Sequence, residues 1–209
     1  ATGASNGYIF IRHGHEGPVE TCRAALRQAQ ELGLVGENIL GSGFNFQLEV
    51  ALTGDSYVAG EESGLMEAIE GKRAMPRFRP PFPAQVGLFG QPSNINNVKT
   101  LSYVPEIISR GGQWFAGIGH DKSTGTAILC LTGALNYTGM IEVPLGTNLK
   151  DVLYEAAGGV PNGKALKLVQ TGGPLGGVLG AGNVDVILDF EVLREAGAIM
   201  GSGGIIAAD

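Results

Sequence analysis

Glycine interrupts the apolar segments of this chain so often that the chain must fold from short elements joined by tight turns. Of the 209 residues, 35 are glycine, more than twice the average usage of roughly 7%. They follow no period, which excludes a collagen-like chain, and they cluster at the ends of apolar runs. No apolar run approaches the ~18 residues of a membrane helix, so direct membrane insertion is not expected.

Charge and cysteine usage favour a protein of the reducing cytoplasm that does not bind nucleic acid. The net charge is −6, with no basic face. Cys22 and Cys130 lie far apart in apolar runs, without a CxxC pair or a Cys/His cluster, so we expect buried free thiols and no metal site. The chain starts without Met or a signal peptide and almost at once with a strand-like run. We therefore expect a piece of a longer polypeptide.

The first part of the chain alternates strand and helix patterns, which predicts an α/β layer over residues 1–124. Pro105 falls inside one predicted helix and is expected to bend or split it. From composition and apolar spacing, strands are predicted at residues 7–13 and 46–52, and helices at residues 19–32, 61–70 and 97–109.

The pattern changes after about residue 124, where strands become frequent. Two of them are separated by a short turn and predict a β-hairpin. Hairpin, helix and further strands together predict a β-grasp-like α+β domain over residues 125–209. Its strands are predicted at residues 126–135, 140–144, 165–169, 184–189 and 204–208, and its helix at residues 149–157.

Residues 57–100 concentrate polar groups, aromatic residues and rigid turns, as loops that carry binding sites do. Glu61 and Glu62 fall at an expected helix start, where the helix dipole alone would also favour them. A proline-rich cationic loop follows, and it carries Lys72, Arg73, Arg77, Arg79 and Phe82.

Two features of this segment allow a structural and a functional interpretation. Phe82 could stack on a flat heterocycle or fill a gap in the core. Asn96 and Asn97 could cap a helix or bind a phosphate or a ring edge at its N-terminus. The sequence alone leaves both pairs of alternatives open.

Other motifs argue against two common kinds of site. The GSG at residue 41, the GG at 172 and the GSGG at 201 do not match the dinucleotide-binding GxGxxG. Residues 158–164 have phosphate-loop spacing, but Ala165 replaces the required Ser or Thr and the order is helix to strand. The three histidines, His13, His15 and His120, have no recognisable Ser or Cys partner, so nucleophilic triad catalysis is not expected.

Several runs in the chain resemble one family in collinear order. The family is the NADH-binding flavoprotein (51 kDa-type) subunit of respiratory complex I and of the diaphorases of NAD-dependent hydrogenases and formate dehydrogenases. The runs include YVAGEESGL from Tyr57, EGKRAMPRFRPPFP from Glu70, GLFGQP from Gly87 and NNVKT from Asn96. NILGSGF from Asn38 and the C-terminal GSGGII also fit.

The resemblance implies a function for the segment. In that family FMN takes a hydride from NADH and passes electrons to iron–sulfur clusters. It implies that Tyr57, Gly60, Glu61 and Glu62 lie beside the flavin and nicotinamide, and that Arg79 and Phe82 hold the dinucleotide. FMN would contact Asn96, Asn97 and Thr100. The cofactors supply the hydride chemistry, so no catalytic acid–base residue is expected.

The resemblance also implies an SLBB-type C-terminal domain and partner subunits. The partners would be a 24 kDa-type 2Fe–2S subunit and a quinone, hydrogenase or formate module, in the cytoplasm or peripheral to the inner membrane. The family's glycine-rich GRGGxGFP loop and its 4Fe–4S cysteine motif are absent, so the 209 residues alone are expected to be inactive and to bind FMN poorly. The alternative is a non-catalytic scaffold module that docks subunits of a redox complex.

Overall fold

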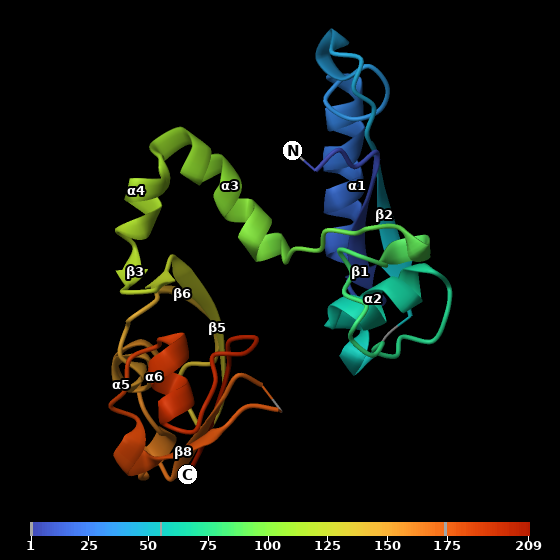
Figure 1. Ribbon diagram of the computed structural model, residues 1–209. Coiled ribbons are helices and arrows are strands. Elements are labelled where there is room, and N and C mark those ends of the chain that lie inside the picture. The colour runs from blue at the N-terminus through green and yellow to red at the C-terminus, as the bar shows by residue number, and fades with distance from the viewer. Residues whose placement is uncertain (1, 55, 174) are drawn as a thin grey trace. The chain divides into compact units, whose positions relative to one another are not determined.

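The computed structural model describes residues 2–54, 56–173 and 175–209, and the chain divides into two compact units between Asn97 and Val98 (Figure 1). We call residues up to Asn97 the first unit and Val98–Asp209 the second unit. The division lies earlier than the predicted boundary between residues 124 and 125. In the second unit, the hydroxyl of Tyr103 donates to the carbonyl of Thr126 at 2.9 Å, which ties the preceding helix to the β-rich part.

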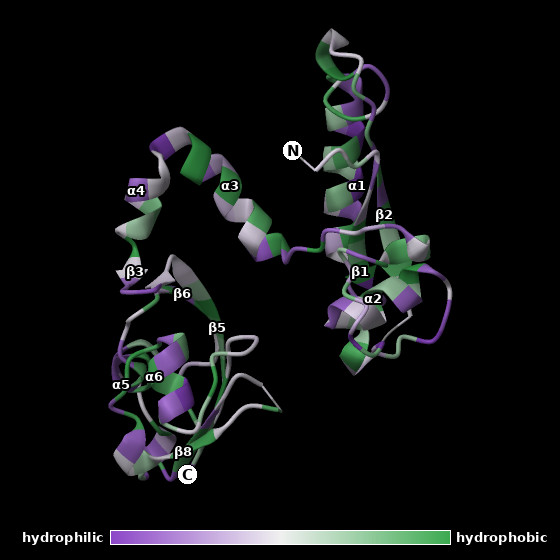
Figure 2. Cartoon of the chain, viewed as in Figure 1, coloured by the Kyte–Doolittle hydropathy of each residue, from purple (hydrophilic) through white to green (hydrophobic). Residues whose placement is uncertain are grey.

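The first unit contains the predicted α/β layer. Strand β1 (Asn6–Arg12) pairs in parallel with β2 (Gln47–Thr53), and helix α1 (Glu16–Glu31) connects them and contacts both. Parallel pairing requires such a crossover, because the chain must return to the same end of the sheet. Hydrophilic and hydrophobic residues alternate along α1 (Figure 2), and Val19 is its buried residue.

A short helix and three single turns complete the first unit. Helix α2 (Glu62–Ile69) confirms the helix predicted at 61–70, and Met66 is its largest buried side chain. The turns are η1 (Ile39–Gly41), η2 (Tyr57–Gly60) and η3 (Leu88–Gly90).

The second unit begins with helices α3 (Val98–Arg110) and α4 (Gly112–Ala116), followed by the short strands β3 (Gly119–His120) and β4 (Ser123–Thr124). Pro105 does not split α3, because the helix continues across it, and the expected bend at Pro105 stays a prediction.

A five-stranded sheet in the order β6-β5-β9-β7-β8 forms the centre of the second unit. The predicted hairpin is confirmed, since β5 and β6 pair antiparallel; β5 and β9 pair in parallel. The strands are β5 (Thr126–Gly133), β6 (Gly139–Pro144), β7 (Leu168–Thr171), β8 (Val178–Gly180) and β9 (Gly204–Ala208). The helical segments are α5 (Leu149–Asp151), η4 (Val152–Ala156), η5 (Pro161–Gly163), η6 (Ala181–Asn183) and α6 (Phe190–Glu195).

The strand predicted at residues 184–189 does not form. Val184 and Leu188 are buried, so the alternation of apolar residues correctly indicated which side chains face the core. The main chain bonds to a turn instead of a sheet: Gly146 N–H donates to the Leu188 carbonyl at 2.9 Å, and Leu149 N–H to the Val186 carbonyl at 2.8 Å. The segment therefore packs its apolar side chains without becoming a strand.

The main hydrophobic core of the described residues lies in the second unit. Of the largest fully buried side chains among the described residues, only Met66 belongs to the first unit; the others include Leu129, Leu149, Leu153, Leu188 and Ile205. The expectation of buried thiols is wrong, because Cys22 is half-buried and Cys130 is exposed. In the described part of the chain, no helix combines the length and the apolar composition that crossing a membrane requires.

Candidate functional site

Glu61 caps the N-terminus of α2. Its Oε2 accepts hydrogen bonds from the main-chain N–H groups of Ser63 at 2.9 Å and Gly64 at 3.1 Å, and from the Ser63 hydroxyl. Burial raises the pKa of Glu61, but these bonds and the positive charge of Arg79 outweigh it, so the pKa lies below its ordinary value. The Glu61 carboxylate is therefore charged at neutral pH and held in one orientation.

Arg79 links the two adjacent carboxylates that the sequence singled out. Its Nη2 pairs with Oε1 of Glu61 and lies 2.8 Å from Oε1 of Glu62. All three side chains are 35–38% exposed. The cluster thus carries one positive and two negative charges at a surface that a ligand can reach.

A second ion cluster holds the cationic loop against α2. Arg77 pairs with Glu67, lies 2.9 Å from Glu70, and donates to the Gly87 carbonyl at 3.3 Å. Glu70 is 7% exposed, pairs with Lys72 at 2.7 Å, and accepts from an N–H of the η3 turn at 2.8 Å. These bonds fix both ends of the loop segment that contains Arg79.

Burial raises the pKa of Glu70, but hydrogen bonds outweigh this effect. They come from Lys72, the main-chain N–H of Phe89 and Arg77, and the resulting pKa is lowered to about 2. Glu70 therefore stays charged far into the acid range.

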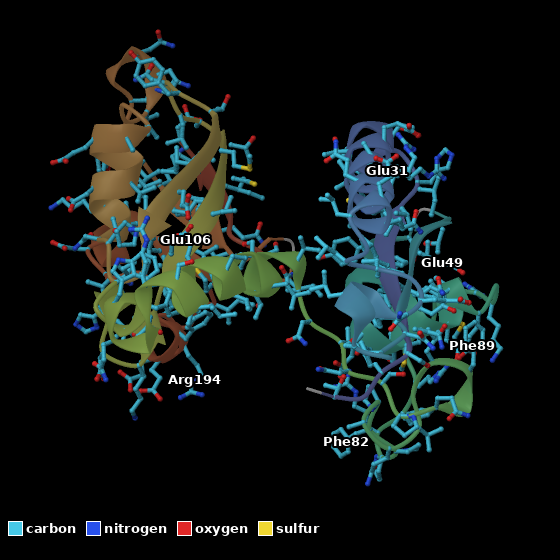
Figure 3. All side chains as sticks on the ribbon, turned by 90° about the horizontal axis from the view of Figure 1, so that it is seen from above. Glu31, Glu49, Phe82, Phe89, Glu106 and Arg194 are labelled. Atoms are coloured by element: carbon cyan, nitrogen blue, oxygen red, sulfur yellow. The ribbon has the colours of Figure 1, made fainter. Side chains whose placement is uncertain are left out.

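Three more predicted residues lie in the same unit with accessible surfaces. Tyr57 is 63% exposed and Phe82 is 52% exposed. Phe82 is therefore not a core plug, and Figure 3 shows it on the loop, apart from Phe89. Gly60 is exposed, its φ is not positive, and a Cβ added there would meet no atom within 4 Å. The chain's own packing does not require glycine at position 60, which leaves room for a ligand.

The predicted FMN contacts Asn96, Asn97 and Thr100 are exposed. The side-chain amide of Asn96 donates to Asn94 at 3.0 Å. Thr100 lies in α3 and so in the second unit, whereas the two asparagines close the first. Their shared role in one site stays a prediction.

The loop and α2 enclose a small hollow beside the Arg79 cluster. Its volume is about 110 Å³, and it is lined by Ser63, Met66, Arg77, Phe78, Arg79, Pro81, Pro83 and Val86. Ser63, Glu67 and Glu70 were not singled out from the sequence, because each of them bonds to Arg77, which lies 7 to 14 residues further along the chain. Among the residues that the structure describes, no group of three His, Cys, Asp or Glu side chains could hold a metal ion.

Two family models match the chain. The Nuo51 FMN-binding domain matches residues 1–106, and the SLBB domain matches residues 128–179. The second match agrees with the β-grasp-like architecture predicted for this part.

Curated relatives align with the whole chain. The NADP-reducing hydrogenase subunit HndC of Solidesulfovibrio fructosivorans is 44% identical over all 209 residues, which cover 43% of that protein. An NADH-quinone oxidoreductase subunit of Rhizobium meliloti (strain 1021) is 42% identical, and the chain covers 50% of it. The chain thus spans half or less of the length of these relatives.

A solved structure agrees with the sequence comparisons. The crystal structure of an NAD+-reducing NiFe hydrogenase in the H2-reduced state matches 99% of this chain and 33% of its own, with a TM-score of 0.82 and 30% identity. The Nuo51 model covers just over half of the residues. On these grounds the chain belongs to the Nuo51 FMN-binding family, with an SLBB domain after the FMN-binding part.

Proposed function

We propose that the native polypeptide carrying this chain is a subunit of an NADH:acceptor oxidoreductase. When bound, FMN supplies the chemistry: it accepts a hydride from NADH and passes the electrons to iron–sulfur clusters. Family membership and the names of the relatives support this proposal, since one is an NADH-quinone oxidoreductase subunit and the other an NADP-reducing hydrogenase subunit.

The observation that carries the proposal is the Arg79 cluster beside an open glycine. Arg79 is held between Glu61 and Glu62, so a cation and two carboxylates occupy defined positions. Gly60 precedes Glu61 and leaves its surroundings open. A flat ring can approach a main chain that has no side chain, while charged groups beside it bind ribose hydroxyls or phosphate. These residues fit FMN and NAD(H).

Within the proposal, the side chains bind and orient the two cofactors. Tyr57 and Gly60 lie beside the flavin and nicotinamide rings. Glu62 accepts hydrogen bonds from the dinucleotide, and Arg79 and Phe82 hold it by charge and by stacking. Asn96, Asn97 and Thr100 donate to FMN. No side chain in this set has to move a proton, because hydride transfer needs positioning above all.

An anaerobic NADH titration of the purified native polypeptide tests the proposal. We expect NADH to bleach the bound flavin, and we expect Arg79→Ala to need a higher NADH concentration for the same bleaching. A flavin-free polypeptide that NADH does not change would contradict the proposal and favour the scaffold alternative. Arg73→Ala, an exposed change in the same loop, is the matched control.

The proposal also implies partners and a location. Electrons would leave through a 4Fe–4S cluster of the polypeptide and a 24 kDa-type 2Fe–2S subunit. A quinone, hydrogenase or formate module would then receive them. Such a complex lies in the cytoplasm or is attached to the inner membrane through its other subunits. Co-purification of the native polypeptide, followed by iron and labile-sulfide analysis, tests this part separately.

A further inference from the structure

We propose that Ser63 is a positioning residue for dinucleotide use, through a hydroxyl that joins the Glu61 carboxylate to the loop carrying Arg79. This inference rests on the function proposed above. Ser63 is uncharged and only 2% exposed, although it borders the small hollow beside Arg79. Its effect must therefore pass through the groups that it contacts.

The donor and the acceptor of each hydrogen bond made by the Ser63 hydroxyl can be assigned. Its Oγ accepts the main-chain N–H of Arg77 at 2.9 Å, across 14 residues of sequence. A serine hydroxyl has one proton to donate. Because Arg77 supplies its own proton, the Ser63 proton goes to Oε2 of Glu61. The hydroxyl thus connects a loop main chain to a carboxylate.

This connection determines how the two oxygens of Glu61 are used. Oε2 receives three donors, the Ser63 and Gly64 N–H groups and the Ser63 hydroxyl. Oε1 is left facing Arg79. The carboxylate of Glu61 is thereby committed to the protein, which leaves Glu62 as the carboxylate that can exchange its contact with Arg79 for a ligand.

The same connection sets the position of Arg79. Arg77 is only two residues before Arg79 in the chain, and its main chain is tied to Ser63 while its side chain pairs with Glu67 and Glu70. Loss of the Ser63 bond leaves this end of the segment held only by the side-chain contacts of Arg77. Arg79 would then reach the two glutamates over a wider range of geometries.

A cap function alone does not require the hydroxyl. The two N–H groups at the start of α2 already satisfy the role of Glu61 as N-cap. The extra hydroxyl bond adds nothing to the end of the helix, but it joins the cap to a distant loop. The bond from the Ser63 hydroxyl therefore indicates that Ser63 positions the loop, in addition to any role in the stability of α2.

Steady-state kinetics of NADH oxidation by the native polypeptide test the inference. In Ser63→Ala we expect KM for NADH to rise about tenfold, the usual scale for losing one hydrogen bond to a charged group, with kcat nearly unchanged. Ser63→Thr keeps the hydroxyl and should restore KM. A Ser63→Ala protein with lower thermal stability and normal KM would overturn the inference.

Ser93→Ala is the matched control. The Ser93 hydroxyl also accepts a loop N–H, that of Leu88, at the same 2.9 Å, but no contact joins it to Glu61 among those that the structure records for Ser93. It should lower stability without changing KM. If both serine variants raise KM equally, general loosening of the loop is the cause and the inference fails.

A double-mutant cycle provides a second test, should Ser63→Thr not fold. If Ser63 acts by joining Glu61 to the loop, Ser63→Ala should raise KM less in a Glu61→Ala background than in the parent, because part of the connection is already lost there. If the two substitutions raise KM by independent factors that multiply in the double variant, the inference is wrong. A parent protein that does not oxidise NADH would instead contradict the proposed function, so the two failures are distinguishable.

Discussion

Nη2 of Arg79 lies 2.8 Å from Oε1 of Glu62 and also pairs with the neighbouring Glu61. One cation therefore holds two adjacent carboxylates that would otherwise repel each other. Because all three side chains are more than a third exposed, solvent screens the pairs and their net contribution to stability is small. The arrangement matters for the position of charge more than for folding.

The first prediction concerns Arg79. Arg79→Ala should raise KM for NADH by about tenfold or more, because a charge-assisted contact to the dinucleotide is lost. The free energy of unfolding should change by less than about 1 kcal/mol, as for other exposed ion pairs. Kinetics and urea denaturation of the same preparations measure both quantities. A large loss of stability with normal KM would show that Arg79 is structural.

The second prediction separates the two glutamates. Glu61→Ala should lower the free energy of unfolding by about 1 kcal/mol, the usual effect of removing a helix N-cap, and should also raise KM for NADH because Glu61 holds Arg79. Glu62→Gln should lower stability by less than Glu61→Ala and should raise KM for NADH, because Glu62 lies in the first turn of α2 but does not cap it. Thermal unfolding and NADH kinetics of both variants check this division. Equal stability losses in the two variants would contradict it.

Local patterns were sufficient to predict most elements. Glu61 and Glu62 were placed at a helix start, and the structure puts Glu61 at the N-cap and Glu62 in the first turn of α2. The β5–β6 hairpin followed from two apolar runs around a short turn. In both cases the deciding contacts join residues that are close in the sequence, so composition and spacing contain the information.

Long-range pairings could not be predicted in the same way. Arg77 pairs with Glu67 and Glu70 only because the loop folds back onto α2, and the sequence showed only a cationic loop. Residues 184–189 have the alternation of a strand, but their main chain bonds to the turn around Gly146 and Thr147. The alternation of apolar residues indicates which side chains are buried. It does not determine the segment to which the main chain forms its hydrogen bonds.

The third prediction tests the stacking role of Phe82. Phe82→Ala should raise KM for NADH several-fold, because an aromatic contact contributes about 0.5–1.5 kcal/mol beyond area burial. Stability should change little, since the ring is 52% exposed. Phe78, 96% exposed on the same loop, is the control, and Phe78→Ala should leave KM unchanged. If the two variants behave alike, Phe82 has no special role.

The fourth prediction concerns stability in acid. Since the folded-state pKa of Glu70 is about 2 against an ordinary value of 4.5, its ionised form stabilises the folded chain above pH 4.5. This contribution, about 2 kcal/mol after allowance for screening, should be lost as pH falls from 4.5 towards 2. Other carboxylates with lowered pKa values, such as Glu61 and Asp189, add to the same trend.

Glu70→Gln isolates the contribution of Glu70. The difference in free energy of unfolding between the parent and this variant should be largest at neutral pH and should shrink as the pH is lowered through 4.5 towards 2. Urea denaturation at several pH values measures it. A difference that stays constant with pH would mean that the carboxylate of Glu70 is not held charged by Lys72 and Arg77.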